Sequence, residues 1–195
     1  AMVDGTIPPE MHDKYLSILL NETERLTKLT NSLLTLNNLN TTGMVLEITD
    51  FDINKVIKDT IETFEGTCKN KMLKVNLVLS GKELFVSADM TRIQQVLYNL
   101  IDNAIKFSPE GESIIINIEK KDKRLIISLT NTGVEITEEV QSQIFNKFYQ
   151  SDESHSSEGY GIGLAVVRKV AELHHGSVNV NSGQGKTTFT VILPM

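Results

Sequence analysis

One amphipathic helix followed directly by two alternating strands constrains the fold of this chain more than any other feature of its sequence. Within Asp89–Phe107 apolar residues recur at the spacing of one helix face. Segments 113–120 and 124–130 then alternate apolar and polar residues around a Lys-Asp-Lys turn, which predicts an antiparallel hairpin. Such strands have one apolar sheet face, and the helix needs a partner for its own apolar face. We therefore predict helices packed on one face of a sheet.

The rest of the chain extends this pattern to an α+β fold, a two-layer sandwich in which helices cover one face of a mixed, largely antiparallel sheet. The patterns predict further helices at 8–40, 52–69, 137–146 and 164–174, and further strands at 44–48, 73–79, 85–86, 177–181 and 187–193. Residues 1–7 are interpreted as a tag remnant and loop, and 41–50 as a linker. One long helix at 8–40 thus precedes a separate domain at 51–195.

A leucine-rich face runs along the predicted helix at 8–40. Leu19, Leu26 and Leu33 recur every seven residues, and Leu29 and Leu36 each follow one of them by three positions. This spacing is typical of a coiled-coil seam, which here extends over roughly three heptads. Because so short a seam is marginal by itself, we expect it to be covered, for instance by the same helix of a second copy.

Composition excludes several classes of protein and of site. The 195 residues carry a net charge of −6, no Trp and 6% aromatic residues, which argues against nucleic-acid partners. A single cysteine, Cys68, excludes an internal disulfide framework and a cysteine-rich zinc site, and it favours a reducing compartment. The apolar runs are too short to span a membrane. The sequence therefore predicts a globular cytoplasmic domain.

A stripe of polar residues lies beside the apolar face of the helix at 89–107. Gln95, Asn99, Asn103 and Lys106 follow one another at steps of four, four and three residues, so they share one side of the helix. Asparagine is a mediocre helix former, and a solvated face would use Glu and Lys at lower cost. Asn oxygens suit Mg²⁺, and a nearby Lys suits phosphate oxygens. Taken alone, the stripe is more readily explained as an ordinary exposed helix face that contains two Asn residues.

A glycine-rich loop comes immediately before the predicted helix at 164–174. Gly159, Gly161 and Gly163 occupy alternate positions, which lets the backbone approach a ligand closely. The helix that follows offers free N–H groups and the positive end of its dipole to an anion. No Gly-Lys-Ser/Thr follows, so this is not a Walker A loop, and no strand leads into it as in a dinucleotide fingerprint. A flexible hinge is the alternative interpretation.

Two further motifs complete an ordered set: a strand-ending Asn-Thr-Gly-Val-Glu turn at 131–135 and a Phe-x₂-Phe box at 145–148. In this order, the motifs of residues 51–195 resemble the ATP-binding domain of bacterial sensor histidine kinases, a fold shared with type II topoisomerases and heat-shock chaperone ATPases (the Bergerat fold). Residues 94–109 are similar to the N box of that family and 159–164 to its G2 box. Residues 25–34 resemble the second helix of its dimerisation and phosphotransfer domain, which would place that helix at 8–40.

The resemblance implies a site for ATP and Mg²⁺. Asn103 would coordinate Mg²⁺, Asn99 would support it one turn earlier, and Lys106 would contact phosphate oxygens; Lys106 and Asn99 are the implied catalytic residues. Asn131 stands where the family has an Asp that accepts a hydrogen bond from the adenine amino group, and Gly133 would let the backbone pass close to the base. The other implied nucleotide-binding residues are Ile136, Phe148, Gly159, Gly161, Gly163, Leu164 and Thr187, with Thr188 as the alternative to Thr187.

The sequence departs from the family pattern in ways that bear on activity. Asn131 replaces Asp, Glu135 replaces the second Gly of the G1 box, and Gln150 stands where an Arg is frequent. The four histidines, which are His12, His155, His174 and His175, do not match the phosphoacceptor motif of the first dimerisation helix. We therefore expect this fragment to bind ATP without phosphorylating itself.

The resemblance implies a Mg²⁺-ATP-binding protein histidine kinase of a two-component system, which passes the γ-phosphate to a histidine absent from this fragment and on to a response regulator receiver domain. The full-length kinase would form a homodimer through the leucine-rich helix and would be anchored in the cell membrane. A degenerate nucleotide-binding or dimerising scaffold remains an alternative because of the three departures. A serine-directed kinase of the anti-sigma type is disfavoured by the leucine-rich helix.

Overall fold

The computed structural model describes residues 8–40, 45–133, 135–150 and 161–195. A short 3₁₀ turn at Pro9–Met11 precedes the helices, which are α1 His12–Asn40, α2 Ile53–Glu62, α3 Glu65–Asn70, α4 Met90–Phe107, α5 Glu138–Gln143 and α6 Gly163–Leu173. The strands are β1 Ile48–Asp52, β2 Lys74–Leu79, β3 Phe85–Asp89, β4 Ser113–Lys121, β5 Arg124–Thr132, β6 Ser177–Gly183 and β7 Lys186–Pro194.

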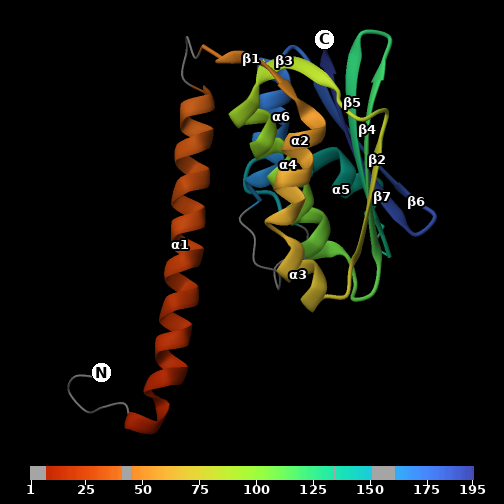
Figure 1. The fold of residues 1–195 in the computed structure, drawn as a ribbon. Coiled ribbons are helices and arrows are strands. Elements are labelled where there is room, and N and C mark those ends of the chain that lie inside the picture. Colours follow the sequence, from red (N-terminus) through yellow and green to blue (C-terminus); the bar gives the residue numbers. More distant parts are fainter. Residues whose placement is uncertain (1–7, 41–44, 134, 151–160) are drawn as a thin grey trace.

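Five of the strands form one mixed sheet in the order β2-β4-β5-β7-β6. The pair β2 and β4 is parallel, whereas the other three pairs are antiparallel. Strands β1 and β3 form a separate antiparallel pair beyond the helices. Helices α2, α4 and α6 lie on one side of the large sheet, as Figure 1 shows. The prediction of a two-layer α+β sandwich with a largely antiparallel sheet is thereby confirmed.

Alternation along the central strands explains why one face of the sheet is covered. Ile114, Ile116 and Ile118 of β4 are fully buried, and their neighbours in sequence are only half-buried. The same pattern continues in β5 and β7. Helix α4 packs the apolar face that its sequence predicts against this surface, with the buried residues Ile93, Val96, Leu97, Leu100, Ile101, Ala104 and Ile105. Burial of these side chains is the main favourable contribution to the fold.

Helix α1 lies beside the remainder of the molecule and touches α6 (Figure 1). Leu29 packs against the hydrophobic core. Leu19, Leu26 and Leu33 are 58%, 59% and 40% exposed, so most of the predicted seam faces solvent in a single chain. The helical prediction for 8–40 holds, and the seam is available to a partner.

Several boundary predictions were wrong: the helix expected at 137–146 ends at Gln143, and the strand expected at 85–86 extends to Asp89. Two further differences have a clear physical reason. The strand expected at 44–48 begins only at Ile48 and extends to Asp52 because it pairs with β3, a partner distant in sequence. The helix expected at 52–69 is broken after Glu62: the Thr63 hydroxyl donates to the Thr60 carbonyl at 2.7 Å, and the Phe64 ring is buried, 4.8 Å between centroids from the ring of Tyr98. Packing of Phe64 therefore overrides the helical pattern at this point.

The start of α4 is fixed by hydrogen bonds from three directions. The Asp89 carboxylate accepts the N–H of Arg92 at 3.1 Å, which caps the helix, and the N–H of Glu47 at 3.2 Å. The Asp89 N–H donates to Nε2 of the buried His174 at 3.1 Å. Helix α4 is thus held at its first turn by the linker before β1 and by the end of α6, and its remaining turns carry the polar stripe.

Cys68 is buried in α3, and burial raises the pKa of its thiol. It is therefore a packing residue with little thiolate character. Of the helices in the described parts of the chain, none combines the length and the apolar character that crossing a membrane requires.

Candidate functional site

The middle of α4 and the first turn of α6 lie against each other. A Cβ atom added to Gly163 would come within 3.6 Å of the Asn99 amide oxygen, so the glycine brings the backbone of α6 close to the polar stripe. Ile162 occupies the N-cap of α6, and among the described residues no side chain caps this end of the helix. The first N–H groups of α6 are therefore available to an anion. Leu164, by contrast, is buried in the core and anchors the helix start.

The polar stripe of α4 keeps its predicted order in three dimensions. Asn99 and Asn103 are half-buried one turn apart, and Lys106 is exposed beyond them. The ammonium group of Lys106 forms an ion pair with the carboxylate of Asp102, four residues earlier. The described residues contain no group of three or more His, Cys, Asp or Glu side chains placed to hold a metal ion. The side chain of Asn103 offers its carboxamide oxygen as a metal ligand, and hard oxygen ligands of this kind suit Mg²⁺.

Asn131 and Thr187 lie directly opposite each other on β5 and β7. Each is only 3% exposed, and Asn131 continues the buried face of β5, toward which α4 packs. The Thr187 hydroxyl is 2.8 Å from that of Ser182, whereas the Asn131 amide has no hydrogen bond to another described residue. An amide side chain at this position can donate to or accept from a polar ligand. Thr188 points to the other sheet face, where its hydroxyl is 2.8 Å from that of Thr130.

The turn after β5 is built around Gly133. Its φ is +96°, and a Cβ atom there would lie 2.9 Å from the ring carbons of Pro109. Any side chain is excluded at this position by both the conformation and the contact. The Glu135 carboxylate accepts the N–H of Gly185, so it binds the turn between β6 and β7. The Ile136 N–H donates to the Ser182 hydroxyl at 2.9 Å.

A second glycine with positive φ joins the Phe-x₂-Phe box to α6. Gly161 has a φ of +64°, and its carbonyl accepts the N–H of Phe148 at 2.8 Å. Phe148 itself has a φ of +63° and is 62% exposed, whereas Phe145 packs edge-on against Phe189, with 6.3 Å between ring centroids. One aromatic residue of the box is therefore part of the core, and the other is free to contact a ligand. Gly159 lies outside the described residues.

The structure thus places the two halves of the predicted site on neighbouring elements. Asn99 meets Gly163 where α4 and α6 pack together, with Leu164 next to it, and Asn103 and Lys106 follow on the same stripe of α4. Asn131, Gly133, Ile136 and Thr187 are around the end of β5 and the start of β7. Sequence reasoning missed two neighbours, Asp102 and Ser182. Asp102 could have been found from its position four residues before Lys106. Ser182 had no sequence signal, because its contacts depend on strand register.

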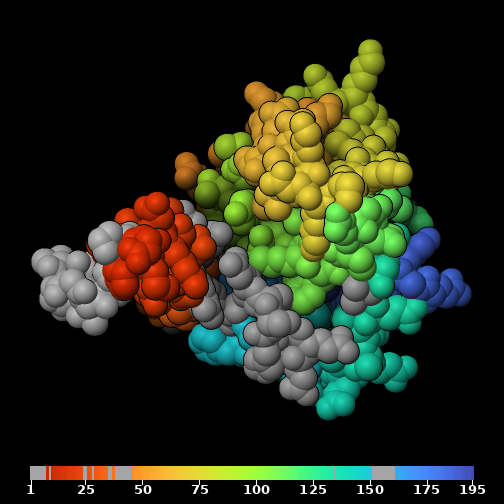
Figure 2. Space-filling model, turned by 90° about the horizontal axis from the view of Figure 1, so that it is seen from below, coloured from red at the N-terminus to blue at the C-terminus, as the bar shows by residue number. Residues whose placement is uncertain are grey.

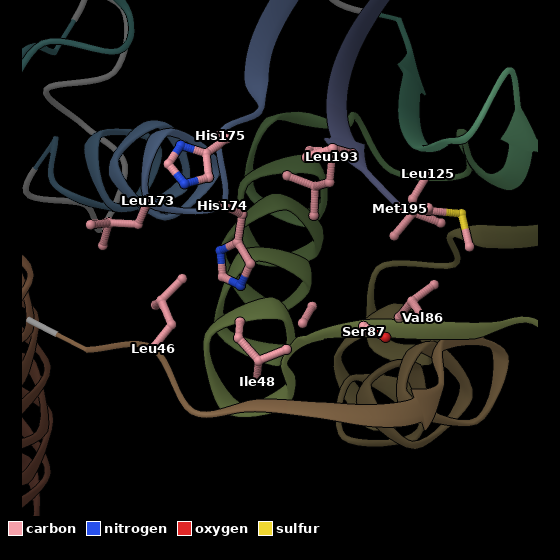
Figure 3. A pocket seen from close by; sticks show the side chains of 12 residues that line it. Leu46, Ile48, Val86, Ser87, Leu125, Leu173, His174, His175, Leu193 and Met195 are labelled. Carbon is pink, nitrogen blue, oxygen red and sulfur yellow. The ribbon is translucent and has the colours of Figure 1, made fainter.

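A cavity of about 630 Å³ lies elsewhere in the molecule. It is enclosed by Leu46 and the β1–β3 pair, by the last residues of α6 and by the chain end, and none of the predicted site residues lines it (Figure 3). His174 lines this cavity, but both of its ring nitrogens are engaged: Nε2 accepts from Asp89, and Nδ1 lies 2.9 Å from the Val170 carbonyl. The cavity is therefore separate from the residues that the motifs single out.

Comparisons with known proteins agree on one family. Residues 88–195 match the family model described as histidine kinase-, DNA gyrase B- and HSP90-like ATPase. Sensor histidine kinase WalK of Bacillus subtilis is 32% identical over 186 residues, which cover 93% of this chain and 30% of WalK. The chain spans 14% of the length of histidine kinase P4 of Formosa agariphila and 34% of that of the sensor protein SrrB of Staphylococcus aureus, which are among its curated relatives.

Two solved structures extend the likeness beyond the matched domain. Histidine kinase ThkA in complex with the response regulator TrrA aligns with a TM-score of 0.80 and 29% identity, covering 99% of this chain and 54% of the other. Full-length ShkA in complex with AMPPNP aligns with a TM-score of 0.83 and 25% identity, covering 93% and 38%. By its fold, its motifs and these matches, the chain belongs to the family of histidine kinase-, DNA gyrase B- and HSP90-like ATPases and contains the ATP-binding catalytic domain of a sensor histidine kinase.

Proposed function

We propose that this chain binds Mg²⁺-ATP and donates the γ-phosphate to a histidine that lies outside residues 1–195. The observation that carries the proposal is the junction of α4 and α6. There the N-terminus of α6, which no described side chain caps, meets Asn99 of the polar stripe at Gly163. Free helix N–H groups, a carboxamide oxygen and an ammonium group are together suited to a metal-bound polyphosphate.

Each side chain has a distinct role in this proposal. Asn103 would hold Mg²⁺, which when bound neutralises charge on the transferred phosphate. Lys106 would exchange its ion pair with Asp102 for a phosphate oxygen, and this exchange costs little because the pair is exposed. Asn131, with Thr187 opposite, would receive the adenine, and Gly133 would let the backbone approach it. Phosphoryl transfer then depends on positioning and charge neutralisation, which these groups supply.

The described histidines support a phosphoacceptor elsewhere. His174 is buried with both ring nitrogens engaged, and His175 lines the separate cavity at the other end of α6. His12 stands at the first residue of α1. ThkA, whose solved complex contains a response regulator, supports a receiver domain as the partner that takes the phosphate. Anchoring of the full-length kinase in a membrane stays a prediction from the family.

We further propose that two copies associate through α1. Leu19, Leu26 and Leu33 are exposed at heptad spacing, so a second α1 would remove them from water. Multi-angle light scattering on the eluting peak should therefore give a mass that rises toward the dimer with concentration. The matched variant Leu26→Ser should shift the equilibrium toward the monomer. A clean monomer at millimolar protein would contradict this proposal.

The kinase proposal is tested by calorimetric titration with AMPPNP, with Mg²⁺ and with excess EDTA. We expect affinity in the micromolar range that depends on Mg²⁺, because phosphate charge must be neutralised. Incubation with γ-labelled ATP should leave the chain without acid-labile label. No heat at millimolar AMPPNP, together with an unchanged melting temperature, would favour the scaffold alternative instead. Acid-labile label on the chain would contradict the external phosphoacceptor.

The Asn131→Asp variant tests whether Asn131 weakens nucleotide binding at the site. A carboxylate makes a charge-assisted hydrogen bond to the adenine amino group, so AMPPNP should bind about tenfold more tightly than to the wild type. Magnesium tripolyphosphate, which lacks adenine, is the control and should bind equally to both proteins. Tighter binding of tripolyphosphate would show that the substitution acts through something other than the base.

A further inference from the structure

The last carbonyl groups of α4 require donors that the helix itself does not supply. The Ile105 carbonyl would normally accept the N–H of residue 109, but Pro109 has none. The side chain of Lys71 fills this place: its ammonium group donates to the Ile105 carbonyl at 2.6 Å and to the Lys106 carbonyl at 2.9 Å. A positive charge at this end also complements the negative end of the helix dipole.

Lys71 is itself held on both sides by its backbone. Its N–H donates to the Thr67 carbonyl at 3.1 Å, and its own carbonyl accepts the N–H of Gly111 at 3.2 Å. The side chain is half-buried between α3 and the loop that follows α4. Figure 2 shows the yellow α3 region directly beside the green end of α4 and its following loop. Lys71 therefore forms hydrogen bonds both to the final turn of α4 and to the loop at 108–111, and so fixes their relative position.

The loop held by Lys71 also contacts the turn after β5. Pro109 packs where a side chain of Gly133 would lie, and the Glu112 carboxylate accepts the hydroxyl of Thr132. The Thr132 hydroxyl oxygen in turn accepts the N–H of Ser113 at 3.0 Å. The base side of the site thus has its own hydrogen bonds to the loop, whereas the two carbonyls at the end of α4 depend on Lys71.

We propose that Lys71 is a positioning residue for the triphosphate end of the site; this inference rests on the proposed function. It holds the backbone of Lys106 without touching the nucleotide. It also keeps the helix-end carbonyls occupied, which leaves the Lys106 ammonium group engaged only in its exchangeable surface ion pair with Asp102 among the described residues. Without Lys71 these carbonyls would compete for that ammonium group, since a lysine near a helix C-terminus can bind its last carbonyls.

The test measures how tightly two ligands, the Mg²⁺–AMPPNP complex and adenosine, bind to the wild type and to Lys71→Met. We expect the dissociation constant of the Mg²⁺–AMPPNP complex to rise about tenfold, as for other partners that orient ligating groups, while that of adenosine stays unchanged. Lys71→Arg should restore the wild-type affinity, because its guanidinium can donate to both carbonyls. Lys69→Met is the matched control: it removes the same charge two residues away, from a side chain on the last turn of α3.

Each other outcome counts against the inference. An equal loss for both ligands would assign Lys71 a purely structural role, and an equal loss in Lys69→Met would assign the effect to net charge. Unchanged AMPPNP binding in Lys71→Met would overturn the positioning role directly. If Lys71→Met does not fold, Lys71→Gln, which keeps one donor, replaces it, and failure of both to fold would also make the role structural. A wild type that binds neither ligand would instead refute the proposed function.

Discussion

Asn103→Ala is expected to weaken Mg²⁺-dependent binding of AMPPNP about 100-fold, the upper range for loss of a group that fixes a bound metal. The carboxamide is half-buried on the α4 stripe, one turn beyond Asn99, and alanine offers no oxygen in its place. Alanine is also a better helix former, so the helix itself should not be weakened. Calorimetric titrations with Mg²⁺ and with EDTA measure the effect, because the loss should appear only in the Mg²⁺-dependent part.

The matched control for this variant is Gln94→Ala. Gln94 is exposed on the same helix and also has an amide side chain, but it lies off the polar stripe. Its AMPPNP affinity should equal that of the wild type. A similar loss in both variants would indicate a general effect on α4. A loss in Asn103→Ala that persists in EDTA would show that Asn103 contacts the nucleotide and not the metal.

Gly161→Ala is expected to lower the free energy of unfolding by about 3 kcal/mol, through a left-handed backbone and a clash that cannot relax. The φ of Gly161 is +64°, and an added Cβ would lie 2.7 Å from the carbonyl carbon of Phe148 and 2.8 Å from the N of Tyr149. These are backbone atoms, so no rotamer change relieves the overlap. Urea unfolding followed by circular dichroism measures the loss as a shift of the midpoint.

Gly66→Ala is the control for the glycine series. Gly66 lies in α3, its φ is not positive, and an added Cβ meets nothing within 4 Å. Alanine there should stabilise the protein by about 0.5–1 kcal/mol, which is the usual helix preference over glycine. If Gly161→Ala had the same urea unfolding midpoint as the wild type, this would contradict the close contact between the Phe-x₂-Phe box and the start of α6.

The departures at Asn131 and Glu135 differ in their structural consequences. Asn131 is buried without a hydrogen bond to another described residue. The presence of Asn where the family has Asp therefore bears directly on the affinity of the site for its ligand. Glu135 instead accepts a hydrogen bond from Gly185, so its carboxylate has a structural partner in the β6–β7 turn. Nucleotide affinity should therefore depend on position 131 more than on position 135.

Local sequence patterns predicted most of the elements, because each pattern has a physical cause within a few residues. Alternation predicted the β4–β5 hairpin, and its turn residues Asp122 and Lys123 adopt the left-handed conformation that reverses the chain. The predicted helix starts at 52 and 89 lie next to the observed ones, and Asp52 and Asp89 cap these helices because a short acidic side chain can accept N–H groups of the first turn. The polar stripe of α4 and the alternating glycines could likewise be found from their spacing, whereas the other site residues were named from the family resemblance. The roles of all these residues stay predictions.

Tertiary structure decided the features that join segments distant in sequence. The parallel pairing of β2 with β4, the break of the helix before Phe64 and the later start of β1 each depend on a partner that local spacing does not reveal. The same holds for the site: strand register sets Asn131 opposite Thr187 and turns Thr188 to the other face. The sequence by itself determined the elements, the apolar faces and the identity of the polar groups, because these follow from periodicity and side-chain chemistry. Only packing decided which of these groups meet, as with Lys71 and the end of α4, because such contacts depend on how the whole chain fills its core.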